Sequence, residues 1–296
     1  MTWAYDGTVG WIGVIDTTMT LPDGRSLAYT DCGAPDGPLV VYFHGAPTSR
    51  LDLIGFEESF STFGVRVISP DRPGYGRSSP RPGRGFNDWP RDVAALADHL
   101  GVERFAVMGA SSGGPYVVAC AALLPDRIAG AGVVAGVTDM GWPGAWEGYE
   151  IREATLMRLG DEAAAVRWCE EQYGSDGSRF LETGSEMAPA DMAFLGDQAI
   201  AAGFITSIGE AFHQGVGGFA QDITVQGRPW PFDPSAITAP VRVLHGQADT
   251  LVPIAHGRHT ADVIPGASLE AFPDHGHLSI FAEIPQLSAD LTHSLR

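Results

Sequence analysis

Residues 105–125 read FAVMGASSGGPYVVACAALLP, in which two serines stand within a cluster of glycines between two apolar segments. The first segment has the composition of a buried strand, and the second has that of a helix that ends at Pro125. Gly109 to Gly113 match the pattern G-x-S-x-G, which places its serine at the apex of a very tight turn from strand to helix. This turn restricts the fold strongly, because only small side chains fit two positions before and after the apex.

The turn predicts different roles for the two serines. Ser111 occupies the apex, so its hydroxyl is the candidate nucleophile, and the N-terminus of the following helix favours negative charge beside it. Ser112 lies one residue further, and we expect its backbone N–H rather than its hydroxyl to contribute. A serine hydroxyl is a weak nucleophile, so the chemistry also needs a base, usually a histidine that a carboxylate orients.

The composition is typical of a soluble globular protein with a substantial core: of 296 residues, 44% are hydrophobic and 18% are charged. Apolar runs are too short for a transmembrane helix. The N-terminus lacks a basic start followed by an apolar core, which argues against a secretory signal. Cys32, Cys120 and Cys169 are odd in number and widely spaced, which favours free thiols in a cytoplasmic protein over a disulfide framework or a zinc site.

The formal net charge is −18, with 36 acidic residues against 18 basic residues, all of them arginine. Such a charge repels phosphate backbones and anionic lipid surfaces, so binding of nucleic acid or membrane is disfavoured. We expect a small-molecule substrate as the partner. The sequence leaves the oligomeric state open between a monomer and a homodimer.

Strand-like segments alternate with helix-like segments along most of the chain. This alternation predicts a mostly parallel sheet with helices on both faces, because parallel strands are joined by right-handed crossovers. The predicted strands cover residues 11–21, 24–32, 38–45, 65–71, 105–108, 129–137, 241–249 and 268–274. The predicted helices cover 50–63, 88–101, 113–124, 254–263 and a last segment from Leu278. From 139 to 232 the pattern is mainly helical, which predicts an inserted cap.

Candidate partners for the serine follow two later strands. Asp249 lies in the loop beyond the strand VRVL, and His275 and His277 follow the strand SLEAF within PDHGHLS. Asp139, just after the predicted strand 129–137, is an alternative acid. In a hydrolase built on a parallel sheet, the acid and then the base follow the serine in chain order.

Five motifs carry a resemblance to a known family: HGAP (44–47), DRPGYGRS (71–78), GASSGG (109–114), GQADTLVP (246–253) and HGHLS (275–279). They span nearly the whole chain and resemble the α/β-hydrolase superfamily, in its cap-bearing branch of esterases, C–C bond hydrolases and iminopeptidases. The resemblance implies an α/β-hydrolase fold, with a mostly parallel eight-stranded sheet flanked by helices and a helical cap inserted after strand 6. Residues 1–138 and 233–296 would then form the core domain, and 139–232 the cap.

The resemblance also implies a catalytic triad of Ser111, Asp249 and His277. The family places its histidine directly after a glycine and before an apolar helix start, which selects His277 over His275. Asp249 matches the family position of the acid, and Asp139 stays the alternative because some relatives place the acid after that earlier strand.

The oxyanion of an acyl-transfer intermediate needs two backbone donors. One is expected to be the N–H of Ser112, and the other should come from the HGAP loop. Pro47 has no N–H, so Ala46 is the predicted donor there, beside a glycine that allows close approach. We expect His44 to hold this loop by hydrogen bonding.

Other motif residues receive structural interpretations. Asp71 and Arg72 are predicted to stabilise the turn beside the elbow. His256 and His259 have helical spacing but form no dense ligand motif, and the glycine cluster lacks the ending of a phosphate loop. We therefore expect neither a metal nor a cofactor.

These features predict a carboxylesterase-like serine hydrolase that cleaves an ester, lactone or thioester of a small, largely apolar substrate. The aromatic and methionine side chains of 139–232 are expected to supply part of the pocket. Alternatives with the same triad are C–C bond hydrolysis, iminopeptidase action, perhydrolysis and a biosynthetic cyclisation or lyase step. The acidic run 146–153 is either a solvated helix face or an amine-binding patch. Intact triad residues oppose a purely binding protein, and serine at position 111 disfavours enzymes with an aspartate nucleophile.

Overall fold

An eight-stranded sheet forms the centre of the computed structural model, which describes residues 13–149, 151–183 and 187–295. The strand order is β1-β2-β4-β3-β5-β6-β7-β8. β2 runs antiparallel to both β1 and β4, and the remaining neighbours are parallel. The strands are β1 Ile15–Thr20, β2 Ser26–Gly33, β3 Leu39–Phe43, β4 Arg66–Pro70, β5 Phe105–Ala110, β6 Ile128–Val134, β7 Val241–Gly246 and β8 Ser268–Phe272. This is the α/β-hydrolase fold that the sequence predicts.

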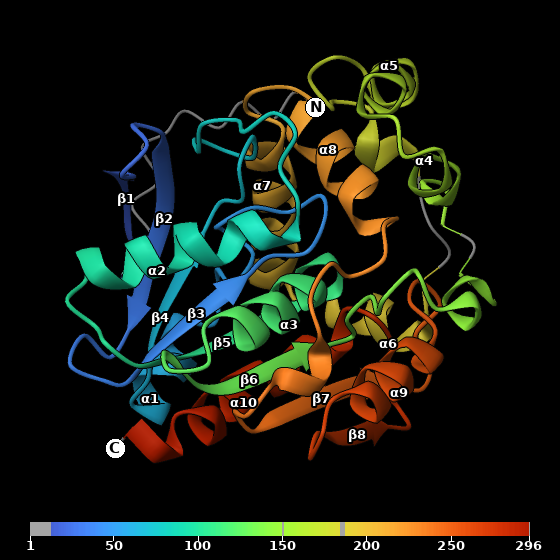
Figure 1. Cartoon of the computed structure of the whole chain (residues 1–296). Coiled ribbons are helices and arrows are strands. Elements are labelled where there is room, and N and C mark those ends of the chain that lie inside the picture. The colour runs from blue at the N-terminus through green and yellow to red at the C-terminus, as the bar shows by residue number, and fades with distance from the viewer. Residues whose placement is uncertain (1–12, 150, 184–186, 296) are drawn as a thin grey trace.

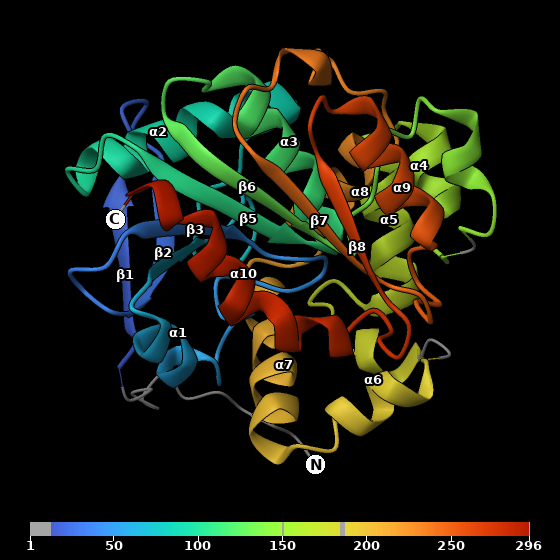
Figure 2. The same cartoon turned by 90° about the horizontal axis from the view of Figure 1, so that it is seen from below.

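Helices cover both faces of the sheet (Figure 1). Figure 2 shows α1 and α10 on the near face, with α2 and α3 beyond the strands. Neighbouring strand residues alternate between the two cores: Val41 packs with the residues of α2 and α3, whereas Val40 packs with those of α1 and α10. The helices are α1 Glu57–Phe63, α2 Trp89–His99, α3 Gly114–Leu123, α9 Ile254–Val263 and α10 Ile284–Leu291.

A separate group of helices lies between β6 and β7 in the chain, beyond the carboxyl ends of the parallel strands (Figure 1). It has an apolar core in which the Phe219 ring packs edge to face against Phe212 and at a tilt against Tyr173. All five helices fall within the predicted cap at 139–232; the division into core and cap at those boundaries stays a prediction. They are α4 Ala154–Leu159, α5 Glu162–Tyr173, α6 Pro189–Phe194, α7 Gln198–Ala211 and α8 Gly217–Gln226.

Several predicted elements differ in their bounds. The helix predicted over 50–63 begins only at Glu57, because the preceding residues form turns that bury Arg50 and Asp52. The strand predicted over 129–137 ends at Val134, since the next residue has a positive φ of 45°. The segment from Leu278 begins as a 3-10 turn before α10. Residues 11 and 12 of the first predicted strand lie outside the described residues.

Two properties bear on the expectations from composition. Within the described ranges, no helix combines the length and the hydrophobicity that a membrane crossing requires. The three cysteines are free, and burial raises the pKa of the Cys120 thiol well above its usual value. Such a thiol stays protonated and packs as a small apolar side chain.

Candidate active site

The turn after β5 takes the tight form that its glycines predict. Ser111 has a φ of 52°, in the left-handed region, and it begins a 3-10 turn that leads into α3. A Cβ at Gly109 would lie 2.9 Å from Val117 Cγ2 and 3.0 Å from the carbonyl oxygen of Phe43. A Cβ at Gly113 would overlap with that same carbonyl oxygen. The two glycines are therefore required because neighbouring backbone occupies the space of any larger side chain.

His277 and Asp249 meet at the carboxyl ends of β8 and β7. Nδ1 of His277 lies 2.8 Å from Oδ2 of Asp249. The other carboxylate oxygen accepts hydrogen bonds from the backbone N–H groups of Leu251 and Val252, at 2.9 and 2.8 Å. His245 Nε2 lies 3.4 Å from Oδ2. The carboxylate is thus fixed from several sides, and it orients the imidazole with Nε2 free of this contact.

The charges of this pair depend on each other. Burial lowers the pKa of His277, but the charge and hydrogen bond of Asp249 outweigh burial, helped by Asp191 and Asp52, so the pKa is raised. Burial would raise the pKa of Asp249, yet the contacts with His277 and His245 hold it well below its usual range. Asp249 is therefore ionised at neutral pH and stabilises positive charge on the imidazole.

Asp191 of α6 holds the backbone around His277, although no sequence motif singles this aspartate out. Its Oδ2 accepts from the N–H of His277 at 2.9 Å. Its Oδ1 accepts from the N–H groups of Leu278 and Ser279, at 2.9 and 2.8 Å, and from the Ser279 hydroxyl at 2.9 Å. A Cβ at Gly276 would overlap with Asp191 Oδ2, so the contact between Asp191 and this loop requires glycine at position 276. This glycine is the sequence signal that corresponds to the contact.

The HGAP loop is held by His44, as the sequence predicts, and also by Arg72, for which the prediction was a role in the turn beside the elbow. His44 Nδ1 lies 2.7 Å from the carbonyl oxygen of Gly45, so Nδ1 carries the proton and Nε2 accepts the backbone N–H of Arg72 at 3.2 Å. The Arg72 guanidinium donates to the carbonyl oxygens of His44 and, at 3.0 Å, of Gly45. Burial and the Arg72 charge lower the pKa of His44, which keeps this ring neutral.

Arg72 also joins the loop to α8 through a buried cluster of charges. The Asp222 carboxylate lies 2.8 Å from Arg72 and 2.7 Å from Arg84, and the Tyr116 hydroxyl donates to it at 2.5 Å. Burial opposes ionisation of Asp222, but the two guanidinium groups outweigh burial and lower its pKa. The segment between β6 and β7 is therefore tied to the sheet directly behind the HGAP loop.

A cavity of about 600 Å³ connects these parts. Ser111, His277, Ala46 and Ser112 all lie in its wall. Its apolar lining includes Tyr149, Tyr173, Phe180, Phe204, Ile208, Phe219 and Ile223. The size and the lining suit a small, largely apolar molecule.

The alternative residues lie elsewhere or are otherwise engaged. Oδ1 of Asp139 accepts from the backbone N–H groups of Gly141 and Trp230, at 2.9 and 3.0 Å. His275 Nε2 faces Glu283 at 3.5 Å. The structure thus brings Asp249 and His277 together, whereas Asp139 and His275 contact other residues.

His259 stacks on Trp142, with ring centroids 4.1 Å apart, and no group of three metal-ligating side chains occurs in the part of the chain that the structure describes. In the acidic run 146–153, Glu147 is exposed, Glu153 lines the cavity and accepts from the Tyr173 hydroxyl, and residue 150 lies outside the described residues.

Comparison with known proteins identifies the family. A model of the alpha/beta hydrolase fold family matches residues 38–283. A non-heme chloroperoxidase from Streptomyces lividans is 30% identical over 283 residues, which cover 93% of this chain and 97% of that protein. A bifunctional esterase/perhydrolase from Acinetobacter calcoaceticus is 26% identical and covers 94% of this chain and 99% of its own. A thermophilic esterase from Thermogutta terrifontis superposes with a TM-score of 0.67 at 24% identity, covering 95% of this chain and 98% of that one. The chain belongs to the α/β-hydrolase family, and it is a hydrolase of that superfamily.

Proposed function

We propose that this hydrolase is a carboxylesterase-like serine hydrolase, which cleaves an ester, lactone or thioester of a small and largely apolar substrate. Ser111 is the nucleophile, His277 the base and Asp249 the residue that orients the base. Ala46 and Ser112 supply the backbone N–H groups for the oxyanion. The bound molecule occupies the cavity between the HGAP loop and the helices inserted after β6.

In the first half of the reaction, Nε2 of His277 accepts the proton of the Ser111 hydroxyl as its oxygen attacks the substrate carbonyl. Nδ1 keeps its proton in the bond to Asp249, whose charge stabilises the imidazolium. The Ala46 and Ser112 N–H groups stabilise the tetrahedral oxyanion. When the intermediate collapses, the leaving alcohol or thiol takes the proton from Nε2 and an acyl-enzyme remains.

Water completes the cycle. His277 accepts a proton from the attacking water, a second tetrahedral intermediate forms on the acyl group, and its collapse releases the acid and restores the Ser111 hydroxyl.

One observation carries the proposal more than any other. Ser111 stands on its strained turn in the wall of the same cavity as His277, and His277 is bonded at 2.8 Å to a buried carboxylate. A structural serine would need neither the left-handed backbone nor an oriented imidazole in the same cavity wall.

The two serines can be separated by experiment. Hydrolysis of p-nitrophenyl esters, thioesters and lactones should fall by about 10³-fold or more in Ser111→Ala, because the nucleophile is lost. Ser112→Ala keeps its backbone N–H and should lose far less. Full activity in Ser111→Ala would contradict the proposal.

Perhydrolysis is the second candidate, and the printed functions of two relatives favour it. Proteins named a chloroperoxidase and an esterase/perhydrolase match this chain over more than nine-tenths of its length. In this reaction hydrogen peroxide replaces water as the attacker of the acyl-enzyme, so a peracid leaves and the Ser111 hydroxyl is restored.

This candidate has a direct readout. Peracid formation from acetate and hydrogen peroxide, followed by bromide oxidation, should be detectable in the native enzyme and absent in Ser111→Ala. If the enzyme hydrolyses esters but forms no peracid, perhydrolysis is rejected and the proposal of a carboxylesterase-like hydrolase is kept.

A further inference from the structure

Among the polar side chains of the cavity wall that the mechanism does not use, two have a buried oxygen without a hydrogen-bond partner. Asp52 follows the HGAP loop and is only 7% exposed. Its Oδ2 accepts from the Tyr42 hydroxyl at 2.6 Å and from the N–H of Gly45 at 3.3 Å. Its Oδ1 is buried and has no hydrogen-bond partner among the described residues. A buried carboxyl oxygen without a partner is unfavourable, so its retention calls for an explanation.

Thr48 is the second such group, at 5% exposed. Its hydroxyl lies close enough to Asp52 to lower the pKa of that carboxyl, but the two groups do not meet in ordinary hydrogen-bond geometry, and Oγ1 also has no partner. A Cβ built on Gly45 would lie 3.6 Å from Thr48 Oγ1 and 3.5 Å from Ser111 Cβ. The Thr48 hydroxyl and the nucleophile therefore flank the same point beside the oxyanion loop.

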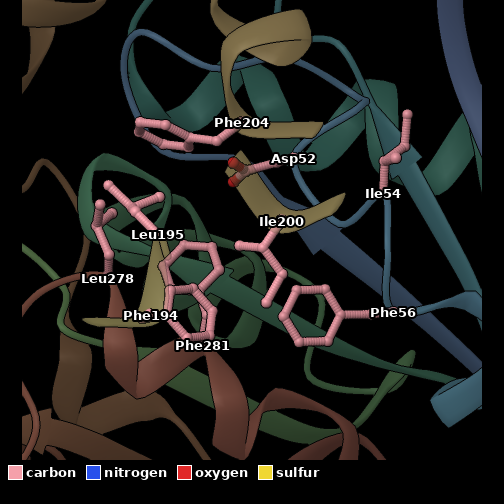
Figure 3. A pocket seen from close by; sticks show the side chains of 9 residues that line it. All are labelled: Asp52, Ile54, Phe56, Phe194, Leu195, Ile200, Phe204, Leu278 and Phe281. Carbon is pink, nitrogen blue, oxygen red and sulfur yellow. The ribbon is translucent and has the colours of Figure 1, made fainter. Parts of the chain in front are cut away.

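Asp52 lines both the large cavity and a small side pocket, whose lining side chains are drawn in Figure 3. The side pocket has a volume of about 20 Å³, and its other lining residues are apolar, among them Phe56, Phe194 and Ile200. Figure 3 shows the carboxyl group of Asp52 between the side chains of Phe204 and Ile200. A polar group of the substrate that reaches this part of the cavity wall has the Asp52 carboxyl and the Thr48 hydroxyl as its nearby partners.

We propose that Thr48 and Asp52 form a subsite for a hydroxyl group of the substrate, close to the scissile carbonyl. A hydroxyl can donate to Asp52 Oδ1 and accept from Thr48 Oγ1 at the same time. An ammonium group offers donors alone and would leave the Thr48 hydrogen unpaired. This inference rests on the proposed serine hydrolase function and narrows its substrates to hydroxylated esters, lactones or thioesters.

Protonation of Asp52 does not abolish such a subsite. Burial raises the pKa of Asp52 despite the hydrogen bonds that oppose the shift. A hydroxyl group can donate to the carboxylate form and accept from the protonated form. An unhydroxylated substrate leaves both protein groups unpaired, and sites built for a hydroxyl discriminate strongly against analogues that lack it.

The test compares matched esters with and without the hydroxyl. The probes are p-nitrophenyl butyrate with its 2-hydroxy and 3-hydroxy derivatives, and ethyl butyrate with 2-hydroxyethyl butyrate. The native enzyme should favour at least one hydroxylated ester over its plain partner by about 10-fold or more in kcat/KM. Asp52→Asn and Thr48→Val should bring that ratio close to one. The ratio is taken within each protein, so a general loss of activity cancels.

Thr183→Val is the matched control. Thr183 also lines the cavity, but its hydroxyl already donates to the carbonyl oxygen of Phe180 at 2.6 Å, so this variant should keep the native ratio. If Asp52→Asn does not fold, the isosteric Thr48→Val carries the test alone. Ratios near one in the native enzyme, or a native ratio that persists in Thr48→Val, would overturn the subsite while ester hydrolysis stands. Absence of hydrolysis of every probe would overturn the proposed function as well.

Discussion

Two carboxylates reach His277 from different elements, and each affects the proton on its ring. Asp249 contacts Nδ1 directly, and Asp191 binds the backbone and adds a smaller charge effect. Both raise the pKa of His277. If His277 is the base, as we propose, it must be neutral to accept the serine proton, so kcat/KM for an ester should fall as the pH decreases through a midpoint above about 6.5, the ordinary histidine value. A pH-rate profile measures this midpoint, and a midpoint well below 6 would contradict the assignment.

Asp249→Asn is expected to lower kcat by about 10⁴-fold, because an amide can place the wrong histidine tautomer toward the serine and no longer stabilises the imidazolium. The measurement is steady-state hydrolysis of a p-nitrophenyl ester by the folded variant. Asp139→Asn is the control for the alternative acid, and a loss as large as that of Asp249→Asn would show that the acid has been misassigned.

Asp191→Asn tests the positioning role. The asparagine side chain must point its NH₂ group at a backbone N–H of residues 277–279, where a carboxylate oxygen accepts in the native protein. We therefore expect a loss of about 1–3 kcal/mol in the free energy of unfolding. Removal of the charge should also move the acidic limb of the pH profile to lower pH. Ser279→Ala removes one hydrogen-bond donor to Asp191 and keeps the charge of Asp191, so the acidic limb of the pH profile should not move in this variant. An unshifted limb in Asp191→Asn would confine Asp191 to a structural role.

At the scale of the element, the turn between β5 and α3 tolerates no side chain at its second glycine. Gly113→Ala should destabilise the protein by about 3 kcal/mol, because the new Cβ would overlap with the carbonyl oxygen of Phe43, which belongs to the backbone and cannot rotate away. Gly209→Ala in α7 is the matched control, since its Cβ would have no atom within 4 Å. This variant should gain about 0.5–1 kcal/mol. Urea denaturation measures both, and equal effects would contradict the packing argument.

The elements that the sequence predicted well are those whose side chains leave a local pattern. The turn at 109–113 has its glycines, the HGAP loop has its proline, and helix α9 was predicted over 254–263, its observed bounds. Asp191 left no local pattern, because its partners are backbone groups more than 80 residues away. The helix predicted over 50–63 was too long because the burial of Arg50 depends on Asp16 and Glu210, which are distant in the sequence.

At the scale of the whole molecule, α6 and α8 are each tied to the sheet by a buried carboxylate. Asp191 binds the loop after β8, and Asp222 binds Arg72 and Arg84 behind the HGAP loop. Two of the helices inserted after β6 thereby help to fix both the loop that carries His277 and, through Arg72, the HGAP loop. Neither tie could be predicted from the sequence, since each joins segments whose spacing only the fold determines.

Asp222→Ala leaves two buried guanidinium groups without their partner. We expect a loss of about 3–5 kcal/mol in the free energy of unfolding at pH 7, measured by urea denaturation. Asp98→Ala breaks the exposed contact with Arg127 and should lose less than about 1 kcal/mol. A loss for Asp222→Ala as small as that for Asp98→Ala would contradict the structural importance of the cluster.

The pH dependence of this stabilisation has a definite sign. The pKa of Asp222 is lowered on folding, so its contribution is complete above about pH 4, the unfolded value, and is lost as the pH falls through the folded pKa. The stability difference between the native protein and Asp222→Ala should therefore shrink only in strong acid. A difference that shrinks between pH 8 and 5 would contradict this.

The central claim is that Ser111 becomes acylated during the reaction. Labelling with an active-site-directed fluorophosphonate, followed by mass spectrometry of the intact protein and its peptides, tests this claim most directly. The account predicts one adduct, located on Ser111, with hydrolytic activity lost in proportion to labelling and no adduct in Ser111→Ala. An adduct located elsewhere with Ser111 unmodified, or full activity in a completely labelled enzyme, would contradict it.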